Sequence, residues 1–180
     1  LASTHRIWVL VAPLLAQDFG VITLDQRGHG ESAKPDAGYD FTTVAADLNG
    51  LLRTLKIETP ILVGHSWGGN VALEHAATYP EEVGGLCLID GGTIEISRYF
   101  QSLETAKAEM APPDFSNMTL DSLRARMREV DFAFEMPPEA RQALEANFEE
   151  LADGNIKARL SRTNHMAVIE AFWNQKPSEL

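Results

Sequence analysis

Hydrophobic and polar positions switch between helical and strand-like patterns along the first half of the chain. Apolar residues at helical spacing predict a helix over residues 7–15, and the apolar run 21–24 predicts a buried strand that ends at Asp25. Asp40 is placed to cap a second helix, which should end before residues 59–60 (Thr-Pro) because proline cannot continue it. The apolar residues that this helix should turn inward are Val44, Leu48, Leu51, Leu52 and Leu55.

The same alternation continues to residue 89. Residues 61–63 predict a second strand, residues 70–78 a helix and residues 86–89 a third strand. Strands separated by helices imply right-handed crossovers and a mostly parallel sheet with helices on both faces. Burial on both faces also explains why these strands are apolar throughout. The pattern therefore predicts the α/β fold class.

The second half of the chain has a different character. Beyond Gly92 the sequence becomes charged, methionine-containing and helix-favouring, and we expect about four helices and no strand. Breaks between the helices fall at residues 111–114, 137–138 and 153–155. We interpret residues 1–92 as a core, residues 93–176 as an inserted helical cap and residues 177–180 as a return toward the core.

The composition fits one globular unit, and the net charge argues against two classes of partner. A chain of 180 residues, of which 44% are apolar, can bury one core and a smaller appendage. The net charge of -11 argues against nucleic acid and against an anionic membrane surface as partners, because both repel an acidic protein.

No targeting or membrane-spanning segment is expected from the sequence. It has no run of about 18 apolar residues that could cross a bilayer. Its first residues lack an initiator Met and the basic start of a signal peptide. The single cysteine, Cys87, lies in an apolar run and is expected to be a packed core thiol. These features favour a cytoplasmic protein.

Residues 64–69 (Gly-His-Ser-Trp-Gly-Gly) carry the chemistry of the chain, because Gly-x-Ser-x-Gly is informative between a strand and a helix. Such a turn strains the backbone of Ser66, exposes its Oγ, and needs Gly64 and Gly68 because a Cβ would collide there. The Trp67 N–H, at the start of the helix, can donate to an oxyanion. A phosphate-binding loop is disfavoured because its Gly-Lys-[Ser/Thr] ending is absent. The remaining alternative is a turn without chemistry.

Residues 25–32 (Asp-Gln-Arg-Gly-His-Gly-Glu-Ser), together with residues 64–69, resemble the capped α/β-hydrolase superfamily. The resemblance covers all 180 residues and implies an α/β-hydrolase fold that is incomplete at both ends. It implies Ser66 as the nucleophile, a small-molecule substrate, and neither a metal nor an organic cofactor. A second oxyanion donor would come from a His-Gly loop expected to precede Leu1. In the family, residues 25–32 mainly brace a turn, so we expect a structural role for Asp25, Arg27 and His29.

The resemblance places the other members of the catalytic triad in the order serine, acid, histidine. Asp90 follows the apolar run 86–89 and matches an acid position that some relatives use. The alternative is a structural Asp90, with the working acid beyond Leu180. No histidine of the chain stands at the position of the triad base, which we also expect beyond Leu180. The chain's histidines are His5, His29, His65, His75 and His165. We expect His65 to be a packing or supporting residue and His165 a solvated or packed one.

The function that follows is hydrolysis through an acyl-enzyme. Ser66 would attack a carbonyl, and the bond cleaved could belong to an ester, a thioester, an amide or a carbon–carbon linkage. A serine in place of an aspartate argues against the alkyl-enzyme chemistry of haloalkane dehalogenases and epoxide hydrolases. The alternative is a non-catalytic, ligand-binding or degenerate member of the superfamily. Residues 1–180 alone are expected to turn over poorly, because a serine without its base is a weak nucleophile.

Overall fold

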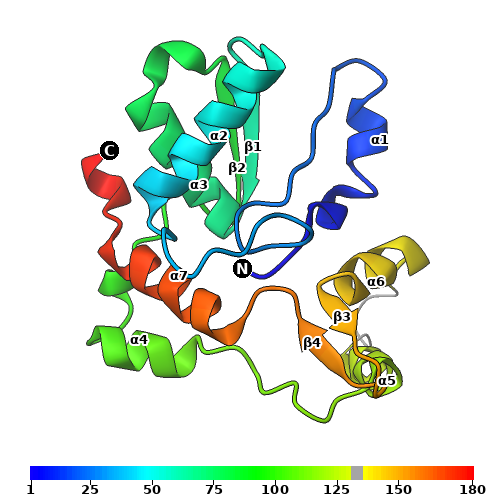
Figure 1. The fold of residues 1–180 in the computed structure, drawn as a ribbon. Helices are drawn as coiled ribbons and strands as arrows, with labels where there is room; N and C mark the ends of the chain where they lie inside the picture. Colours follow the sequence, from blue (N-terminus) through cyan, green and yellow to red (C-terminus); the bar gives the residue numbers. More distant parts are fainter. Residues whose placement is uncertain (131–135) are drawn as a thin grey trace. The chain divides into compact units, whose positions relative to one another are not determined.

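The computed structural model describes residues 1–130 and 136–180, which form two compact units. The first unit contains Leu1 and residues 36–111 and 163–180. The second contains residues 2–35 and 112–162. Each unit can be followed by colour along the chain in Figure 1.

A parallel strand pair with two helices forms the centre of the first unit. Strand β1 (Ile61–His65) pairs with β2 (Gly85–Ile89), and the register runs from Ile61 opposite Gly85 to His65 opposite Ile89. Helix α2 (Phe41–Leu55) packs on α3 (Trp67–Thr78), which packs on both strands (Figure 1). The short 3-10 helix η2 (Pro80–Glu82) joins α3 to β2. The predicted strands and the helix between them are therefore confirmed.

Helix α2 begins and ends where the sequence predicts. The Asp40 carboxylate accepts hydrogen bonds from the Thr43 N–H and hydroxyl, both at 2.8 Å, which caps the first turn. The helix ends at Leu55 and is followed by Lys56, whose backbone is left-handed with φ 55°. Val44 and Leu52 are buried as expected, whereas Leu55 is exposed and was wrongly placed inward.

Only one face of the strand pair is covered within the described residues. Side chains alternate along a strand, and α3 packs on the face that carries Leu62, which is buried. The opposite face carries Val63, Cys87 and Ile89, and all three are exposed. The prediction of helices on both faces is therefore wrong for these residues, and so is the core position predicted for Cys87.

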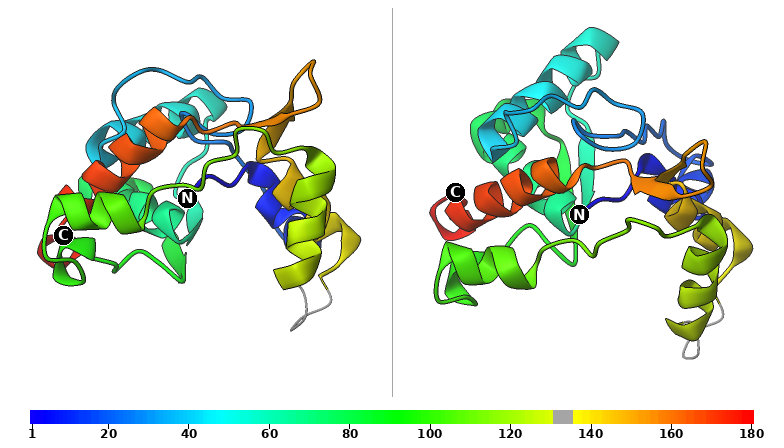
Figure 2. Two further views of the ribbon diagram at one scale, coloured as in Figure 1. Left: turned by 90° about the horizontal axis from the view of Figure 1, so that it is seen from below. Right: turned by 60° about the horizontal axis from the view of Figure 1, so that its bottom comes forward.

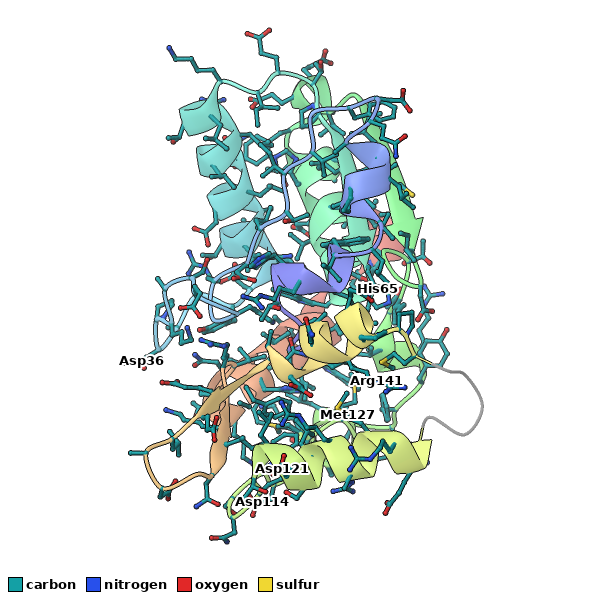
Figure 3. The ribbon with its side chains drawn as sticks, turned by 90° about the vertical axis from the view of Figure 1, so that its right-hand side faces the viewer. Asp36, His65, Asp114, Asp121, Met127 and Arg141 are labelled. Carbon is teal, nitrogen blue, oxygen red and sulfur yellow. The ribbon has the colours of Figure 1, made fainter. Side chains whose placement is uncertain are left out.

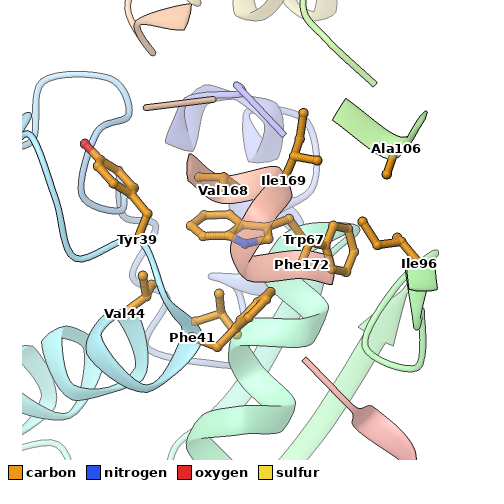
Figure 4. Close-up of a cluster of buried hydrophobic side chains, with 10 residues drawn as sticks. Tyr39, Phe41, Val44, Trp67, Ile96, Ala106, Val168, Ile169 and Phe172 are labelled. Atoms are coloured by element: carbon orange, nitrogen blue, oxygen red, sulfur yellow. The ribbon is translucent and has the colours of Figure 1, made fainter. Parts of the chain in front are cut away.

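The main core of the first unit surrounds Trp67, as Figure 4 shows. The ring of Phe41 lies 6.1 Å from that of Trp67 and 5.9 Å from that of Phe172 on α7 (Arg162–Asn174). The other buried members of this core are Tyr39, Val44, Val71, Ile96, Ala106, Val168 and Ile169. The remaining elements are η3 (Ile96–Arg98), α4 (Leu103–Glu109) and η5 (Pro177–Glu179). The two views of Figure 2 show α7 beside the start of α3. The core and cap boundaries at residues 92 and 176 stay a prediction.

The start of the second unit departs from the prediction. Residues 7–15 form the 3-10 helix η1 (His5–Trp8) and the short helix α1 (Ala12–Leu15) instead of one helix. Pro13 explains the break, because proline has no N–H and is tolerated only in the first turn of a helix. Residues 21–24 pair with no strand of the described residues, and Ile22 is 54% exposed. The predicted strand is wrong, because an extended segment without a neighbour has no ladder of hydrogen bonds.

The rest of the second unit combines two helices with a hairpin. An ion pair links helix α5 (Leu120–Val130) to helix α6 (Pro138–Glu145). The Arg124 guanidinium on α5 donates to both carboxylate oxygens of Glu145 on α6, at 2.8 and 3.0 Å. Strands β3 (Phe148–Glu150) and β4 (Ile156–Ala158) pair antiparallel, contrary to the prediction of a cap without strands. Three residues are too few to show an alternating pattern in the sequence.

Candidate active site

Ser66 lies alone between the last residue of β1 and the first residue of α3. Its backbone has φ 53° and ψ -123°, a region that non-glycine residues rarely adopt. The Ser66 N–H donates to the Ile89 carbonyl at 2.9 Å, and the Ser66 carbonyl accepts from the Gly69 N–H at 2.8 Å. The sharp strand-to-helix turn that the Gly-x-Ser-x-Gly motif predicts is therefore present.

Three glycines make this turn sterically possible. A Cβ on Gly64 would overlap the Gly68 carbonyl, and a Cβ on Gly91 would overlap the Ser66 carbonyl. A Cβ on Gly69 would lie 2.7 Å from the backbone nitrogen of Gly92. The turn thus packs backbone against backbone on the segment that follows β2, and that segment was not part of the predicted motif.

The two residues next to Ser66 in the sequence, His65 and Trp67, differ in their exposure to solvent. Ser66 itself is half-buried, whereas the Trp67 side chain is 4% exposed and belongs to the core in Figure 4. The Trp67 backbone begins α3, where N–H groups point out of the helix end. His65, labelled in Figure 3, is exposed, so the packing role predicted for it is not seen within the described residues.

Asp90 reaches the same edge of the sheet as Ser66. The two strands are parallel and His65 pairs with Ile89, so the next residue of each strand leaves the sheet at its carboxyl edge. Asp90 is exposed and has a left-handed backbone with φ 46°. The structure thus brings together the three predicted site residues: Ser66, Trp67 and Asp90.

The loop that begins at Asp25 is organised by that residue's carboxylate. It accepts hydrogen bonds from the His5 N–H at 2.6 Å and the Glu31 N–H at 3.0 Å. Burial alone would raise the pKa of Asp25, but these hydrogen bonds outweigh it and hold the pKa below its usual range. The Ser32 hydroxyl donates to the Asp25 carbonyl at 2.6 Å, and a Cβ on Gly30 would overlap the Asp25 carboxylate. Asp25 therefore has the bracing role that the sequence suggests.

Comparison with known proteins decides the family. A family model described as the alpha/beta hydrolase fold matches residues 1–173. The chain belongs to this family. The family and the fold class predicted from the sequence are therefore confirmed.

Relatives of this α/β-hydrolase-fold chain include enzymes with small-molecule substrates in their names. A 2-(acetamidomethylene)succinate hydrolase from Mesorhizobium japonicum is 46% identical over 76 residues, which are 42% of this chain and 27% of that protein. A fluoroacetate dehalogenase from a Burkholderia species is 40% identical over 90 residues, which are 47% of this chain and 30% of that protein.

A solved structure extends the likeness to almost the whole chain. The crystal structure of E-2-(acetamidomethylene)succinate hydrolase matches 99% of this α/β-hydrolase-fold chain with a TM-score of 0.79 and 27% identity. The match covers 65% of that structure. The matches thus span less than a third of the curated relatives and about two thirds of this structure.

The remaining histidines of the α/β-hydrolase-fold chain are His5, His29, His75 and His165. His5 and His29 belong to the second unit, where burial lowers the pKa of His29 and its Nδ1 hydrogen-bonds the Arg27 carbonyl at 2.9 Å. His165 is buried on α7, which confirms the packed alternative for it. His75, on α3, is fully buried, and neither ring nitrogen has a hydrogen-bond partner within the described residues.

Sequence reasoning missed a pair of buried amides behind the site. Asn70, in the first turns of α3, is fully buried, and its Nδ2 donates to the Oε1 of Gln175 at 2.7 Å. The two residues are 105 positions apart, so no local pattern could join them. The only local sign of this pair in the sequence is that Asn70, a polar residue, follows Gly68 and Gly69 directly. A polar residue is equally common near the start of a helix, so this sign does not point to Gln175.

Other features of the described residues add no chemistry to the site. In residues 1–130 and 136–180, no group of three or more His, Cys, Asp or Glu side chains is placed to hold a metal ion. The same residues contain no helix long and apolar enough to span a membrane.

A hollow of about 210 Å³ lies between α5 and α6. It is lined by Met127 and Arg141, labelled in Figure 3, and by Arg124, Arg128 and Glu145.

Proposed function

We propose that Ser66 is the nucleophile of a serine hydrolase that works through an acyl-enzyme. The observation that carries the proposal is the backbone of Ser66, which is strained, half-buried and set between β1 and α3 at the carboxyl edge of the strands. Membership of the α/β-hydrolase fold family, with a hydrolase and a dehalogenase among the relatives, supports hydrolytic chemistry.

The reaction follows from the groups at this edge. Ser66 Oγ would lose its proton to a histidine and attack a substrate carbonyl carbon, and the Trp67 N–H would donate to the oxyanion that forms. The leaving group would depart with the proton from the histidine, and water would hydrolyse the acyl-enzyme by the same route in reverse. Asp90, one residue past β2, would orient the histidine. We propose that this histidine lies outside residues 1–180.

The bond cleaved is proposed from the relatives and from the nucleophile. A relative is named a 2-(acetamidomethylene)succinate hydrolase, which makes a small amide the first substrate to test, with esters and thioesters next. The dehalogenase relative suggests a second chemistry, but an alkyl-enzyme mechanism would need a carboxylate where this chain has Ser66. No observation favours a purely ligand-binding function.

A fluorophosphonate probe tests the nucleophile directly. Residues 1–180 and the longest reading frame that contains them would be labelled, and the adduct would be located by peptide mass spectrometry. We expect the longer protein to be labelled at Ser66, and residues 1–180 to react at least about 100-fold more slowly because the base is missing. The variant Ser66→Ala should lose labelling, whereas Ser116→Ala, which alters a serine of the second unit, should keep it. Adducts at another serine, or none in the longer protein, would refute the proposal.

A further inference from the structure

Asn70 holds the segment that follows Asp90. The Asn70 side chain is 0% exposed, and its Oδ1 accepts a hydrogen bond from the Gly92 N–H at 2.9 Å. Its Nδ2 donates to the Ile94 carbonyl at 3.0 Å. One side chain therefore binds the backbone on both sides of Thr93, much as a neighbouring strand would.

Gln175 adds two hydrogen bonds to Asn70, whose amide orientation is set by its backbone partners. The Oε1 of Gln175 accepts from Asn70 Nδ2 at 2.7 Å, and its Nε2 donates to the Asn70 carbonyl at 3.2 Å and to Glu74 Oε2 at 2.9 Å. The Gly92 N–H can only donate and the Ile94 carbonyl can only accept, so the oxygen and nitrogen of Asn70 cannot be exchanged. Buried polar groups that are fully satisfied in this way rigidify their surroundings.

The turn that leads into the segment held by Asn70 has an unfavourable backbone at Asp90. Asp90 has φ 46°, although it is not a glycine, whereas Gly92 has φ 86°, which glycine adopts readily. Gly91 between them packs against the Ser66 carbonyl so closely that no Cβ would fit. Such conformations persist only where the surrounding structure holds them. Asn70 is bonded to the exit of this turn and stands four residues after Ser66 on the helix that starts there.

We propose that Asn70 is a positioning residue that fixes Asp90 relative to Ser66. The inference rests on the proposed function, in which Asp90 orients the triad histidine. An acid that is displaced by about 1 Å no longer holds the histidine in its productive orientation, and such a shift can cost about 100-fold in rate. Asn70 acts only through the backbone of residues 90–94 and does not touch the reacting atoms.

The test compares Asn70→Ala with Asn49→Ala in the longest reading frame that contains residues 1–180. Asn49 is a matched control, because it is buried and its Nδ2 also crosses to another element, donating to Glu82 Oε2 at 2.9 Å. Hydrolysis of 4-nitrophenyl acetate and thermal unfolding would be measured for both variants. We expect Asn70→Ala to lower kcat about 10- to 100-fold with KM changed less than about twofold. Asn49→Ala should lose comparable stability and keep kcat.

The pH profile separates positioning from folding. An aspartate held beside a histidine raises the histidine pKa, so the acidic limb of kcat/KM should move to lower pH in Asn70→Ala and stay in place in Asn49→Ala. Gln175→Ala keeps the hydrogen bonds from the Asn70 side chain to the backbone of Gly92 and Ile94. It removes the hydrogen bonds between Gln175 and Asn70. It should show a smaller loss of kcat in the same direction, and it serves as the test if Asn70→Ala does not fold.

Two further variants distinguish the failure of this inference from failure of the proposed function. If Ser66→Ala keeps activity, the proposed function fails, and if Asp90→Asn keeps activity, the role of Asp90 fails and that of Asn70 with it. If both variants are inactive while Asn70→Ala and Gln175→Ala retain the kcat and pH profile of the unaltered protein, only the positioning role of Asn70 is overturned.

Discussion

At the scale of single residues, Ser66 and Asp90 share an uncommon property. Both have positive φ without being glycine, a conformation that costs about 1–3 kcal/mol at each position. Both stand directly after a strand of the parallel pair. Two of the strained positions of the described residues are therefore those where we place the nucleophile and the acid, and the surrounding backbone contacts must hold them.

His75 shows a second residue-scale feature, a buried imidazole with no hydrogen-bond partner among the described residues. Burial lowers its pKa below the ordinary 6.5, while Glu82 acts weakly in the opposite direction. Below pH 6.5 the unfolded chain takes up a proton at His75 that the folded chain does not bind. The stability that comes from a neutral His75 is thus complete above about pH 6.5 and falls as the pH decreases.

We predict that the stability of residues 1–180 falls between pH 7.5 and pH 5.5, and that His75→Leu makes this fall shallower. One such group contributes at most about 1.4 kcal/mol for each pH unit. Urea unfolding at several pH values measures the slope, and part of it should remain because burial also lowers the pKa of His29. An unchanged slope in His75→Leu would contradict the prediction.

At the scale of elements, local signals decided what could be predicted. Helix α2 was predictable because Asp40 caps it and Pro60 follows it, and the Ser66 turn because its motif is short and contiguous. The helix predicted over residues 7–15 is wrong because Pro13 belongs to the first turn of a helix, so the chain forms η1 and α1 instead. The hairpin of β3 and β4 was missed because each strand has three residues, although an Asp-Gly pair at its turn is a known hairpin signal.

Contacts between distant elements explain what could not be predicted. Asn70 and Gln175 meet only after α3 and α7 have packed, and the need for Gly91 arises only when the segment after β2 lies against Ser66. Such positions look like ordinary polar or small residues in the sequence. The turn that carries Ser66, the proposed nucleophile, was therefore predictable from the sequence, and the contacts that support the turn were not.

The packing of the segment after β2 on the Ser66 turn gives an element-scale prediction. Gly91→Ala should lower the free energy of unfolding by about 2 kcal/mol or more, because the new Cβ overlaps the Ser66 carbonyl. Gly50→Ala is the matched control on α2, where a Cβ meets nothing within 4 Å. It should raise stability by roughly 0.5–1 kcal/mol, since alanine favours a helix over glycine. Denaturant unfolding of both variants checks this, and equal effects would argue against the close packing.

At the scale of the whole molecule, net charge and exposed apolar surface have opposite effects on the association of copies of the chain. The net charge of -11 opposes association between copies of the chain. The uncovered face of the strand pair presents Ile61 at 60% and Val63 at 42% exposure, and such apolar side chains favour association. Strands of a parallel sheet are usually buried on both faces, so this exposed face is the least ordinary surface of the first unit.

Cys87 reports on this face, since it pairs with Val63 and is exposed. We predict that Cys87 in folded residues 1–180 reacts with a small aromatic disulfide at a rate of the same order as in the urea-unfolded chain. A core thiol would react only through unfolding, so its rate would fall as conditions become more stabilising. Absorbance of the released thiolate measures the rate, and Cys87→Ser supplies the blank. Protection that disappears with added urea would instead place Cys87 in the interior, as its apolar neighbours in the sequence suggest.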